Sequence, residues 1–375
     1  MKKWLCLLIG IVLLLSSCSG AVTTVLQENE HGVEISGTPV QSLDGRVGYT
    51  GLARKGDALY YVYNKDTITM KIVEISADGV KTIYTEPSSP LSVEGMVGAP
   101  AIQLYEDQLI AVEDDRIIQY DSQTGIWETN ERLSSIPYLF GEYYCLNGDI
   151  VYHYSEEDPD DEFTYRHFVG CYSDGSLRSY DNDVEYYPDA ESTDSVEYYP
   201  QRQFGGTDGE SLYYTQWILH PDEQQQTELR RYHTTDRTED ILFRSETYSA
   251  ADWTEYVVLC ASEGYVVFEK IRYWDEENPY EIYSMATTPQ GKTPKRIYAS
   301  DEDVAISEIY NDCVYLATTQ GVIRYNLETD EQTVLSDRYA ENCYILDDTW
   351  VYFVSDDASL WRVAQDGSVV EHVYG

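Results

Sequence analysis

The chain has 375 residues, in which 25 Lys and Arg residues stand against 67 Asp and Glu residues, so the formal net charge is −42. This acidity argues against nucleic acid as a partner, because phosphate binding needs a basic surface. It favours cationic partners such as metal ions, basic peptides and amines, although an acidic surface also keeps an exported protein soluble.

The first residues have the pattern of a bacterial export signal. Two lysines precede an apolar run from Trp4 to Leu15, which is too short to cross a bilayer comfortably as a helix. The run ends in Leu-Ser-Ser-Cys, which resembles the lipobox of bacterial lipoproteins. The resemblance implies that residues 1–17 are a signal peptide and that acyl chains on Cys18 anchor the protein to the extracytoplasmic face of the cell membrane. The alternative is an ordinary secretory signal with an incidental cysteine.

After the signal, residues 18–45 are predicted to be a tether, with an extra strand completing a terminal sheet as one option. Residues 46–375 contain a repeat in which an acidic or glycine-containing turn precedes an aromatic strand. Seven copies begin at residues 56, 106, 147, 208, 262, 311 and 346. Each copy belongs to a unit of four short strands joined by tight turns, and the spacing of roughly 35–60 residues is that of a propeller blade.

The second strand of each unit favours a propeller over a sandwich. Strands such as ALYYVY, YVVF and WVYFV are nearly continuous in apolar and aromatic residues, which is typical of strands that are covered on both faces. The 36 tyrosines fit this arrangement, because a tyrosine ring can fill the space between blades while its hydroxyl reaches water or a carbonyl group. The sequence therefore predicts an all-β fold, a β-propeller of seven four-stranded blades, with six or eight blades as alternatives.

Over roughly residues 46–375, this pattern of turn, aromatic pair, turn, strand and Asp-Gly resembles low-density-lipoprotein-receptor-type and TolB-type propellers. It especially resembles the tyrosine-rich, uncharacterised propeller lipoproteins of Gram-positive bacteria. The Tyr-Trp-Thr-Asp signature of the receptor family is absent, since the two nearest stretches read Tyr-Tyr-Thr-Gln at 213–216 and Tyr-Trp-Asp-Glu at 273–276. The resemblance therefore implies the architecture and no particular partner.

The predicted loops between second and third strands mark one face of the ring. In an up-and-down blade these loops emerge on the same side as the links between blades. In the third, fourth and fifth units they are long and acidic, at residues 155–163, 220–228 and 273–281, and the link at 181–204 contains VEYYP twice. The simplest interpretation is that charge keeps long loops solvated.

Two functional interpretations of this face remain. The cluster Asp158, Asp160, Asp161 and Glu162 is a candidate Ca²⁺ site of hard oxygen ligands, although its spacing is not that of an EF-hand. A candidate ligand-binding set can stack on sugars or clamp a basic peptide. Its members are Tyr186, Tyr187, Tyr198, Tyr199, Trp274, Tyr280, Glu276 and Glu277.

Histidines and cysteines give weaker signals. His153 with His167, and His220 with His233, are predicted to lie across adjacent strands, where a zinc site is one option and ordinary polar strand positions are the other. Beyond Cys18, five cysteines remain outside the signal, an odd number without a CxxC motif, which favours free buried thiols. A bridge between residues 145 and 171 stays open as an alternative.

Short catalytic motifs such as GxSxG, HExxH, a P-loop or GxGxxG are absent. We therefore expect a membrane-anchored lipoprotein that acts as a non-enzymatic binding or scaffold propeller for a peptide, protein or glycan. A cell-surface glycan hydrolase or lyase is the alternative. A third option is an assembly or quality-control lipoprotein whose blade edges recruit extended chains.

Overall fold

The computed structural model describes the following residues: 32–40, 46–47, 51–63, 71–85, 102–105, 108–113, 116–136, 143–146, 149–158, 161–173, 176–179, 197–220, 224–236, 238–249, 252, 254–262, 264–275, 279–288, 293–302, 304–306 and 309–375. For the strands between residues 143 and 204, only the course of the backbone is described. Within these ranges no helix is long and apolar enough to cross a membrane.

The described residues form seven antiparallel sheets, numbered here in chain order. The first sheet contains β2 (Leu52–Lys55), β3 (Ala58–Tyr63), β4 (Lys71–Ser76) and β5 (Gly79–Thr85). The second contains β6 (Ile102–Tyr105), β7 (Gln108–Glu113), β8 (Arg116–Asp121) and β9 (Ile126–Thr129), followed by the short helix α2 (Glu131–Ser134). The third contains β1 (Arg46–Val47), β10 (Tyr143–Leu146), β11 (Asp149–Asp158), β12 (Asp161–Ser173) and β13 (Ser176–Ser179).

The remaining sheets repeat the same up-and-down order. The fourth contains β14 (Glu197–Thr207), β15 (Ser211–Leu219), β16 (Gln224–His233), β17 (Thr238–Arg244) and the short β18 (Tyr248–Ser249). The fifth contains β19 (Thr254–Ser262), β20 (Tyr265–Arg272), β21 (Tyr280–Ala286) and β22 (Lys295–Ser300). The sixth contains β23 (Ala305–Ile306), β24 (Cys313–Thr318), β25 (Gly321–Asn326) and β26 (Gln332–Ser336). The seventh contains β27 (Asn342–Ile345), β28 (Trp350–Val354), β29 (Leu360–Ala364) and β30 (Val370–Tyr374).

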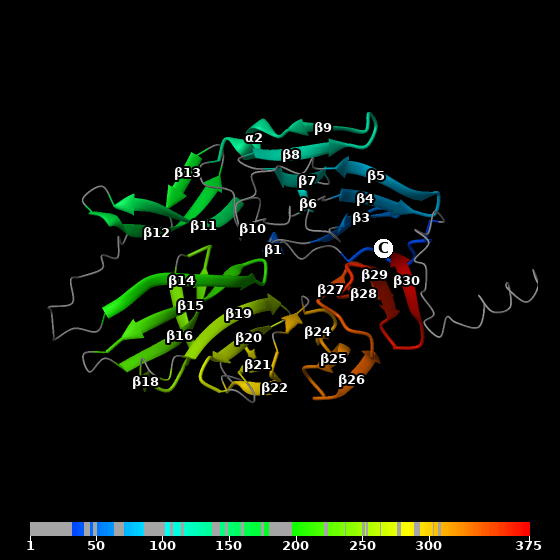
Figure 1. Cartoon of the computed structure of the whole chain (residues 1–375). Helices are drawn as coiled ribbons and strands as arrows, with labels where there is room; N and C mark the ends of the chain where they lie inside the picture. Colours follow the sequence, from blue (N-terminus) through cyan, green and yellow to red (C-terminus); the bar gives the residue numbers. More distant parts are fainter. Residues whose placement is uncertain are drawn as a thin grey trace, which may run out of the picture.

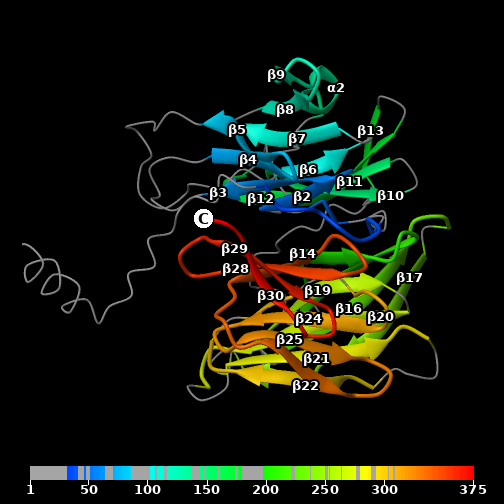
Figure 2. The ribbon, with the colours of Figure 1, turned by 90° about the vertical axis from the view of Figure 1, so that its right-hand side faces the viewer.

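The sheets follow one another around a centre, and the blue first sheet lies beside the red seventh sheet (Figure 1). The same two sheets are neighbours when the molecule is seen from the side (Figure 2). This arrangement confirms the predicted all-β propeller fold. The number of blades stays a prediction, because parts of the chain lie outside the described residues.

Consecutive sheets pack face to face through shared apolar clusters. One cluster joins the first and second sheets, and others join the fourth to the fifth, the fifth to the sixth, the sixth to the seventh and the seventh to the first. The first strands β14 and β19 approach so closely that a Cβ added at Gly205 would lie 1.7 Å from the carbonyl oxygen of Val258. Radial stacking of sheets therefore supplies the core, as the continuous apolar second strands predicted.

The second strands of the sheets are buried on both faces, which explains why apolar and polar residues do not alternate along them. All six residues of β24 and all five residues of β28 are buried, so both faces of these strands are covered. Tyrosines fill much of this space, and Tyr213, Tyr315 and Tyr352 are among the largest fully buried side chains. Their rings pack between sheets while several hydroxyls donate to nearby oxygens; Tyr61, for example, donates to the carbonyl of Ala358 at 2.6 Å.

These buried tyrosines predict a loss of stability in alkali. Burial raises the pKa of Tyr60 and of Tyr344 to about 12, and it raises the pKa of Tyr61, Tyr315 and Tyr352 as well. Because the folded state holds these phenolic protons more tightly than the unfolded chain does, the free energy of unfolding is unaffected below the ordinary pKa near 10 and falls as pH rises towards 12.

A phenolate absorbance titration, followed together with circular dichroism, checks this prediction. We expect a large share of the tyrosines to ionise only as the sheets unfold. Complete ionisation near pH 10 with an intact fold would contradict it.

The acidic stretches predicted as long loops are mostly strand. Residues 155–158 continue β11 and residues 161–163 begin β12, with Ser155 opposite His167 and Glu156 opposite Arg166. Similarly, β16 begins at Gln224 inside the predicted loop 220–228. The loop prediction was wrong there because it weighed only charge: continued pairing satisfies backbone N–H and C=O groups, whatever the side chains are. The result is long hairpins whose ends lie on one side of the ring.

The cysteines form no disulfide where the structure describes them. Cys260, Cys313 and Cys343 are buried and unbridged, which confirms the prediction of buried thiols for these three. The alternative bridge between Cys145 and Cys171 is wrong. Residue 145 lies on β10 and residue 171 on β12, with β11 between them, so their backbones are separated by two strand spacings of about 4.8 Å, farther than a disulfide reaches.

Candidate functional site

The structure describes only part of the predicted ligand-binding set. Tyr186, Tyr187, Glu276 and Glu277 lie outside the described residues, as do Cys18 and Asp160. Tyr198 and Tyr199 lie on β14 of the fourth sheet, where Tyr198 pairs with Ile218, instead of on a free link. Trp274 and Tyr280 are both described and flank one turn of the fifth sheet. The predicted binding face is thus described most fully at the β20–β21 hairpin.

Two adjacent aromatic side chains are exposed at the end of this hairpin. Tyr273 is 63% exposed and Trp274 is 50% exposed. They follow β20 directly, in a turn that is held by two backbone hydrogen bonds, from Arg272 N to Pro279 O at 2.8 Å and from Asp275 N to Arg272 O at 3.0 Å. The hairpin therefore presents both rings to solvent from a fixed base, and we call Tyr273 and Trp274 the aromatic tip.

Charged groups below the aromatic tip are already paired. Glu281 is 3% exposed and accepts from Arg296 at 2.6 Å and from Arg272 at 2.9 Å. Arg272 also contacts Asp275 at 3.4 Å, and its guanidinium lies 5.6 Å from the ring centre of Trp274. A chain of contacts thus runs from a buried carboxylate, through one arginine, to the exposed indole.

Tyr273 is held by a carboxylate of the neighbouring strand. Its hydroxyl donates to Glu255 on β19 at 2.7 Å, and this hydrogen bond, with a smaller effect of burial, raises the pKa of Tyr273 to about 12. On the same sheet, burial and the nearby Arg272 lower the pKa of Lys270, whose ammonium lies 5.8 Å from the ring centre of Tyr256. At neutral pH the tip therefore offers neutral aromatic surface above carboxylates that are engaged with protein partners.

The structure places one of the two predicted histidine pairs across adjacent strands. His220 follows β15 and His233 ends β16, so they lie at opposite ends of one hairpin, whose antiparallel strands separate them by its whole length. His153 is opposite Val169, and His167 is opposite Ser155, so these two lie on the adjacent strands β11 and β12, offset diagonally by two residues. Within the described part of the chain, no three His, Cys, Asp or Glu side chains are grouped so that they can hold a metal ion.

The predicted Ca²⁺ ligands lie at the end of another hairpin. Asp158 and Asp161 are opposite each other where β11 meets β12, and Glu162 is the next residue of β12. The backbone thus brings three of the four residues to one hairpin end. The calcium site itself stays a prediction.

Sequence reasoning missed a Ser-His-Asp arrangement in the fourth sheet. The ring nitrogens of His233 lie 3.2 Å from Ser211 Oγ and 3.1 Å from Asp240 Oδ2. Ser211 is only 3% exposed, and its N–H donates to the turn residue Asp208, while Asp240 is also paired with Arg231 at 2.7 Å. Because a nucleophile needs room for the substrate carbonyl, this arrangement links three strands and does not form a catalytic triad.

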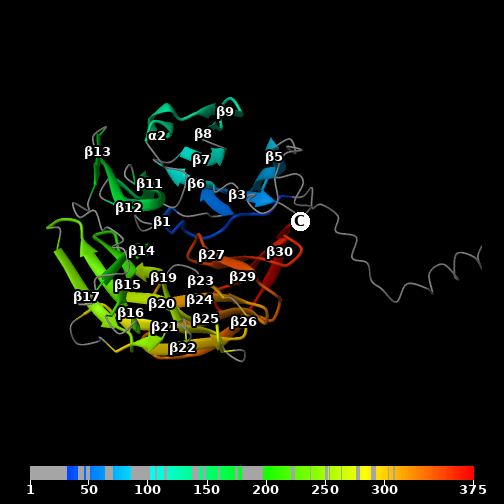
Figure 3. The same cartoon turned by 60° about the vertical axis from the view of Figure 1, so that its left-hand side comes forward.

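The second polar feature that the sequence did not reveal lies where the first and seventh sheets meet. Residues 32–40, which we call the latch, run in an extended conformation between these sheets (Figure 3). The seventh sheet is complete without them, and the latch adds only an isolated bridge between Pro39 and Asp347. The extra strand that does occur is β1, which pairs with β10 in the third sheet.

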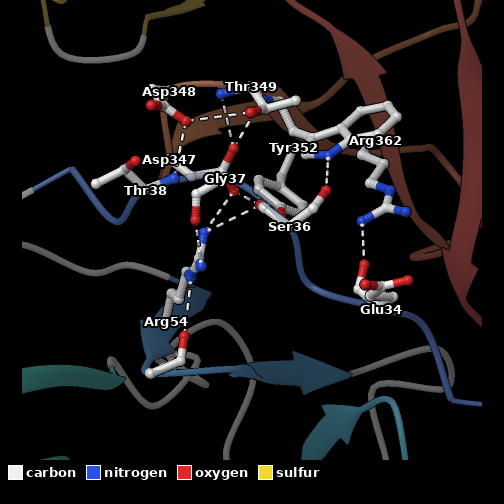
Figure 4. Close-up of polar contacts among 12 residues, drawn as sticks. Glu34, Ser36, Gly37, Thr38, Arg54, Asp347, Asp348, Thr349, Tyr352 and Arg362 are labelled. Carbon is white, nitrogen blue, oxygen red and sulfur yellow. Dashed lines mark hydrogen bonds and ion pairs between the residues drawn. The ribbon is translucent and has the colours of Figure 1, made fainter.

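A buried ion pair lies at the centre of this junction (Figure 4). Arg54 of β2 and Asp347, in the turn before β28, are 2.9 Å apart, and their side chains are 3% and 0% exposed. Both carboxylate oxygens of Asp347 accept further hydrogen bonds, from the hydroxyl of Tyr352 and from the backbone N–H groups of residues 349 and 350. Arg54 donates further to the carbonyls of Ser36 and Gly37. The pair thus joins the two ends of the ring and the latch.

The seventh sheet holds the rest of the latch (Figure 4). Arg362 donates to the carbonyl of Glu34 at 3.0 Å, and the indole of Trp350 donates to the Ser36 hydroxyl at 3.0 Å. Asp348 accepts from the N–H of Thr38 and donates its own N–H to the Thr38 carbonyl. Gly37 has a φ of +94°, and an added Cβ would lie 2.8 Å from side-chain oxygens of residues 347 and 349, so only glycine fits there.

The latch is close to energetic balance. Burial of Ile35 contributes about 2 kcal/mol. Seven hydrogen bonds to residues 34–40 contribute about 1 kcal/mol each. Ordering the backbone of nine residues costs about 1 kcal/mol each or slightly more. The two sides agree within a few kcal/mol, so these contributions alone give the latch little net stability, as is typical of segments that open locally.

Comparisons with known proteins find distant structural similarity and no related family. No protein-family model matches the chain, and no curated protein sequence matches it significantly. Among solved structures, it is similar to the β-propeller domain of the trilobed protease from Pyrococcus furiosus, at 12% identity over 76% of this chain and 82% of that one, with a TM-score of 0.40. It is similar to BamB from Moraxella catarrhalis at 9% identity over 92% and 91% of the two chains, with a TM-score of 0.38.

A third similar structure is dipeptidyl peptidase 4 from Porphyromonas gingivalis, at 10% identity and a TM-score of 0.43. The alignment covers 90% of this chain but 56% of the peptidase, so the chain spans little more than half of that protein. At such identities the likeness concerns the fold alone.

Proposed function

We propose that this chain is an extracytoplasmic lipoprotein, anchored through acyl chains on Cys18, that acts as a non-enzymatic binding propeller. The observation that carries the proposal is the aromatic tip, where the consecutive residues Tyr273 and Trp274 are both exposed beside a turn that is held by two backbone hydrogen bonds. Exposed aromatic rings on a fixed base are typical of surfaces that bind glycans or polypeptides.

Charge favours a glycan over a strongly basic peptide as the ligand of the tip. Glu255 is bound by Tyr273, and Glu281 is bound by two arginines. The charge of Glu281 is already balanced by two arginines, so this carboxylate offers little attraction to a lysine or arginine side chain. A sugar ring needs only an apolar face and hydrogen bonds at its edge, which the exposed rings and the Glu255 carboxylate can supply.

Replacing Trp274 with alanine is expected to weaken ligand binding by about tenfold, because loss of one aromatic contact of about 1.4 kcal/mol changes the dissociation constant by that factor. The measurement is a glycan array together with capture from cell envelopes, first with the unmodified chain and then with the variant. Ile126→Ala is the matched control, since Ile126 is 55% exposed on the second sheet, away from the tip. If Trp274→Ala and the unmodified chain bound the ligand with the same dissociation constant, the aromatic tip would not be the binding surface.

Anchoring has a separate test. Replacing Cys18 with serine is expected to release the protein from the membrane fraction and to leave residues 1–17 uncleaved, because the thiol is the acylated group in lipoproteins of this pattern. Mass spectrometry of the N-terminal peptide of the unmodified protein should show an acylated residue 18. An unmodified thiol there, in a protein that stays with the membrane, would point to another form of attachment.

A further inference from the structure

The latch lies in a groove that recognises an extended backbone. Arg362 donates to the carbonyl at residue 34, Arg54 donates to the carbonyls at residues 36 and 37, and Asp348 pairs with both backbone groups of residue 38. The N–H of Val40 donates to the carbonyl of residue 346. Hydrogen bonds to backbone groups select the conformation of a segment and largely ignore its side chains.

The apolar anchor of the latch is Ile35, and the half-buried Val33 packs against the same cluster. Ile35 is 7% exposed and belongs to the cluster between the first and seventh sheets, whereas residues 34 and 36–39 are exposed. The only formal charge within the latch is Glu34. We call the surface formed by Arg54, Asp348, Trp350 and Arg362, with the Ile35 position, the closing groove. It fits an extended segment with a branched aliphatic side chain two residues before a glycine.

The groove does not depend on the latch for its walls. Below the latch, Leu59 and Val73 of the first sheet share a cluster with Tyr352 and Leu360 of the seventh. The hydroxyl of Tyr61 also bonds directly to the seventh sheet. The two sheets therefore remain packed when the latch leaves, and the donors and acceptors of the groove become available to another segment.

We propose that the closing groove is a reversible peptide-binding site and that its second occupant is the latch of another copy of this chain. The segment in place shows that this sequence fits, and the near balance of its energetics allows exchange. A largely uncharged segment also limits repulsion between copies of an acidic chain. Anchoring of both copies to one membrane, which rests on the proposed function, raises their effective concentration; the affinity of the groove for the segment does not rest on it.

The first test loosens the latch in the full chain, solubilised in detergent. Ile35→Asp places a carboxylate against the apolar cluster and favours an empty groove. A fluorescent peptide of residues 32–40 is expected to bind this variant at least tenfold more tightly than it binds the unmodified chain, where the attached latch competes. Val334→Asp is the matched control, because Val334 is 60% exposed on β26, and it should bind like the unmodified chain. A peptide carrying the same Asp at its fourth position should bind none of them.

The second test leaves every groove residue unchanged. A protease site placed at residues 41–45 allows the latch to be cut from the ring after folding, with a cut at residues 289–292 as the control. The labelled peptide is expected to replace the cut latch. When two differently labelled anchored proteins are mixed in one vesicle, crosslinks should form between residue 35 of one copy and the groove of the other.

Failure of the peptide to bind the cut protein, or equal binding by the Asp-containing peptide, overturns the proposal. Because Trp274→Ala does not touch the groove, it should bind the peptide normally, which separates this result from the proposed glycan site.

Discussion

Replacing Asp347 with alanine is expected to lower the free energy of unfolding by about 3–5 kcal/mol, because it leaves a buried arginine without its counter-ion. Arg54 is 3% exposed in its side chain and has Asp347 as its carboxylate partner at 2.9 Å. The substitution also removes the acceptor of the Tyr352 hydroxyl and of two backbone N–H groups in the turn before β28. Urea unfolding followed by circular dichroism and tryptophan fluorescence measures the loss.

Asp208→Ala is the matched control for this result. Asp208 occupies the same position of the turn in the fourth sheet, where it accepts from the hydroxyl of Tyr213 at 2.6 Å and from the N–H groups of residues 210 and 211; among the described residues no ion pair joins it to an arginine. Its removal should cost about 1–2 kcal/mol, the amount expected for lost hydrogen bonds alone.

A double variant separates charge from turn geometry. Arg54→Met with Asp347→Leu should recover part of the loss, since an apolar pair avoids the desolvation of two charges. Equal losses for Asp347→Ala and Asp208→Ala would show that the buried ion pair adds nothing to the closure of the ring.

The propeller could be predicted from the sequence because its cause is local. A second strand such as β28 is apolar at every position, and that pattern requires cover on both faces wherever the strand lies. The hairpin ends were harder to predict, because charged residues were taken as a sign of loops. On β11 and β12, backbone pairing continues through residues 155–158 despite those charges, since the ladder satisfies main-chain groups independently of side-chain polarity.

The closing of the ring could not be predicted, because its partners are distant in the chain and carry no periodic signal. Arg54 and Asp347 are separated by 293 positions, and the latch holds one buried aliphatic residue among exposed ones. One signal was nevertheless present in the aligned repeats. An aspartate stands five residues before a tyrosine in both the fourth and the seventh units, and in each case the tyrosine hydroxyl binds that carboxylate.

The sequence predicted that aromatic residues of the fifth unit are exposed, but it did not reveal which residues hold them in place. Trp274 and Tyr280 were singled out for being aromatic within an acidic stretch, and Trp274 is indeed exposed at a hairpin end. Tyr273 and the residues that hold the tip were missed, because the partners of Glu281 come from two other strands of the fifth sheet and one of them, Arg296, lies on β22. Only the register of the sheet brings them together.

Replacing Glu281 with alanine is expected to lower the free energy of unfolding by about 2–3 kcal/mol, the range for hydrogen bonds to charged groups, and to weaken ligand binding at the aromatic tip. The carboxylate, 3% exposed, holds Arg272 and Arg296, and Arg272 in turn lies against Trp274. Without Glu281, the described ion pair that is left to Arg272 is the longer one to Asp275, at 3.4 Å. The guanidinium is then held less firmly against the indole of Trp274.

Two measurements distinguish this role from simple destabilisation. Asp240→Ala removes a carboxylate that is 48% exposed and paired with Arg231 in the neighbouring sheet, and it should cost about 1 kcal/mol or less with ligand affinity unchanged. Glu281→Gln keeps the size and one acceptor oxygen, so it should recover part of the affinity while remaining less stable than the unmodified chain. If Glu281→Ala bound ligand as tightly as Asp240→Ala at a temperature where both are folded, the paired charges below the tip would have no part in positioning Trp274, and recognition would depend on the exposed rings alone.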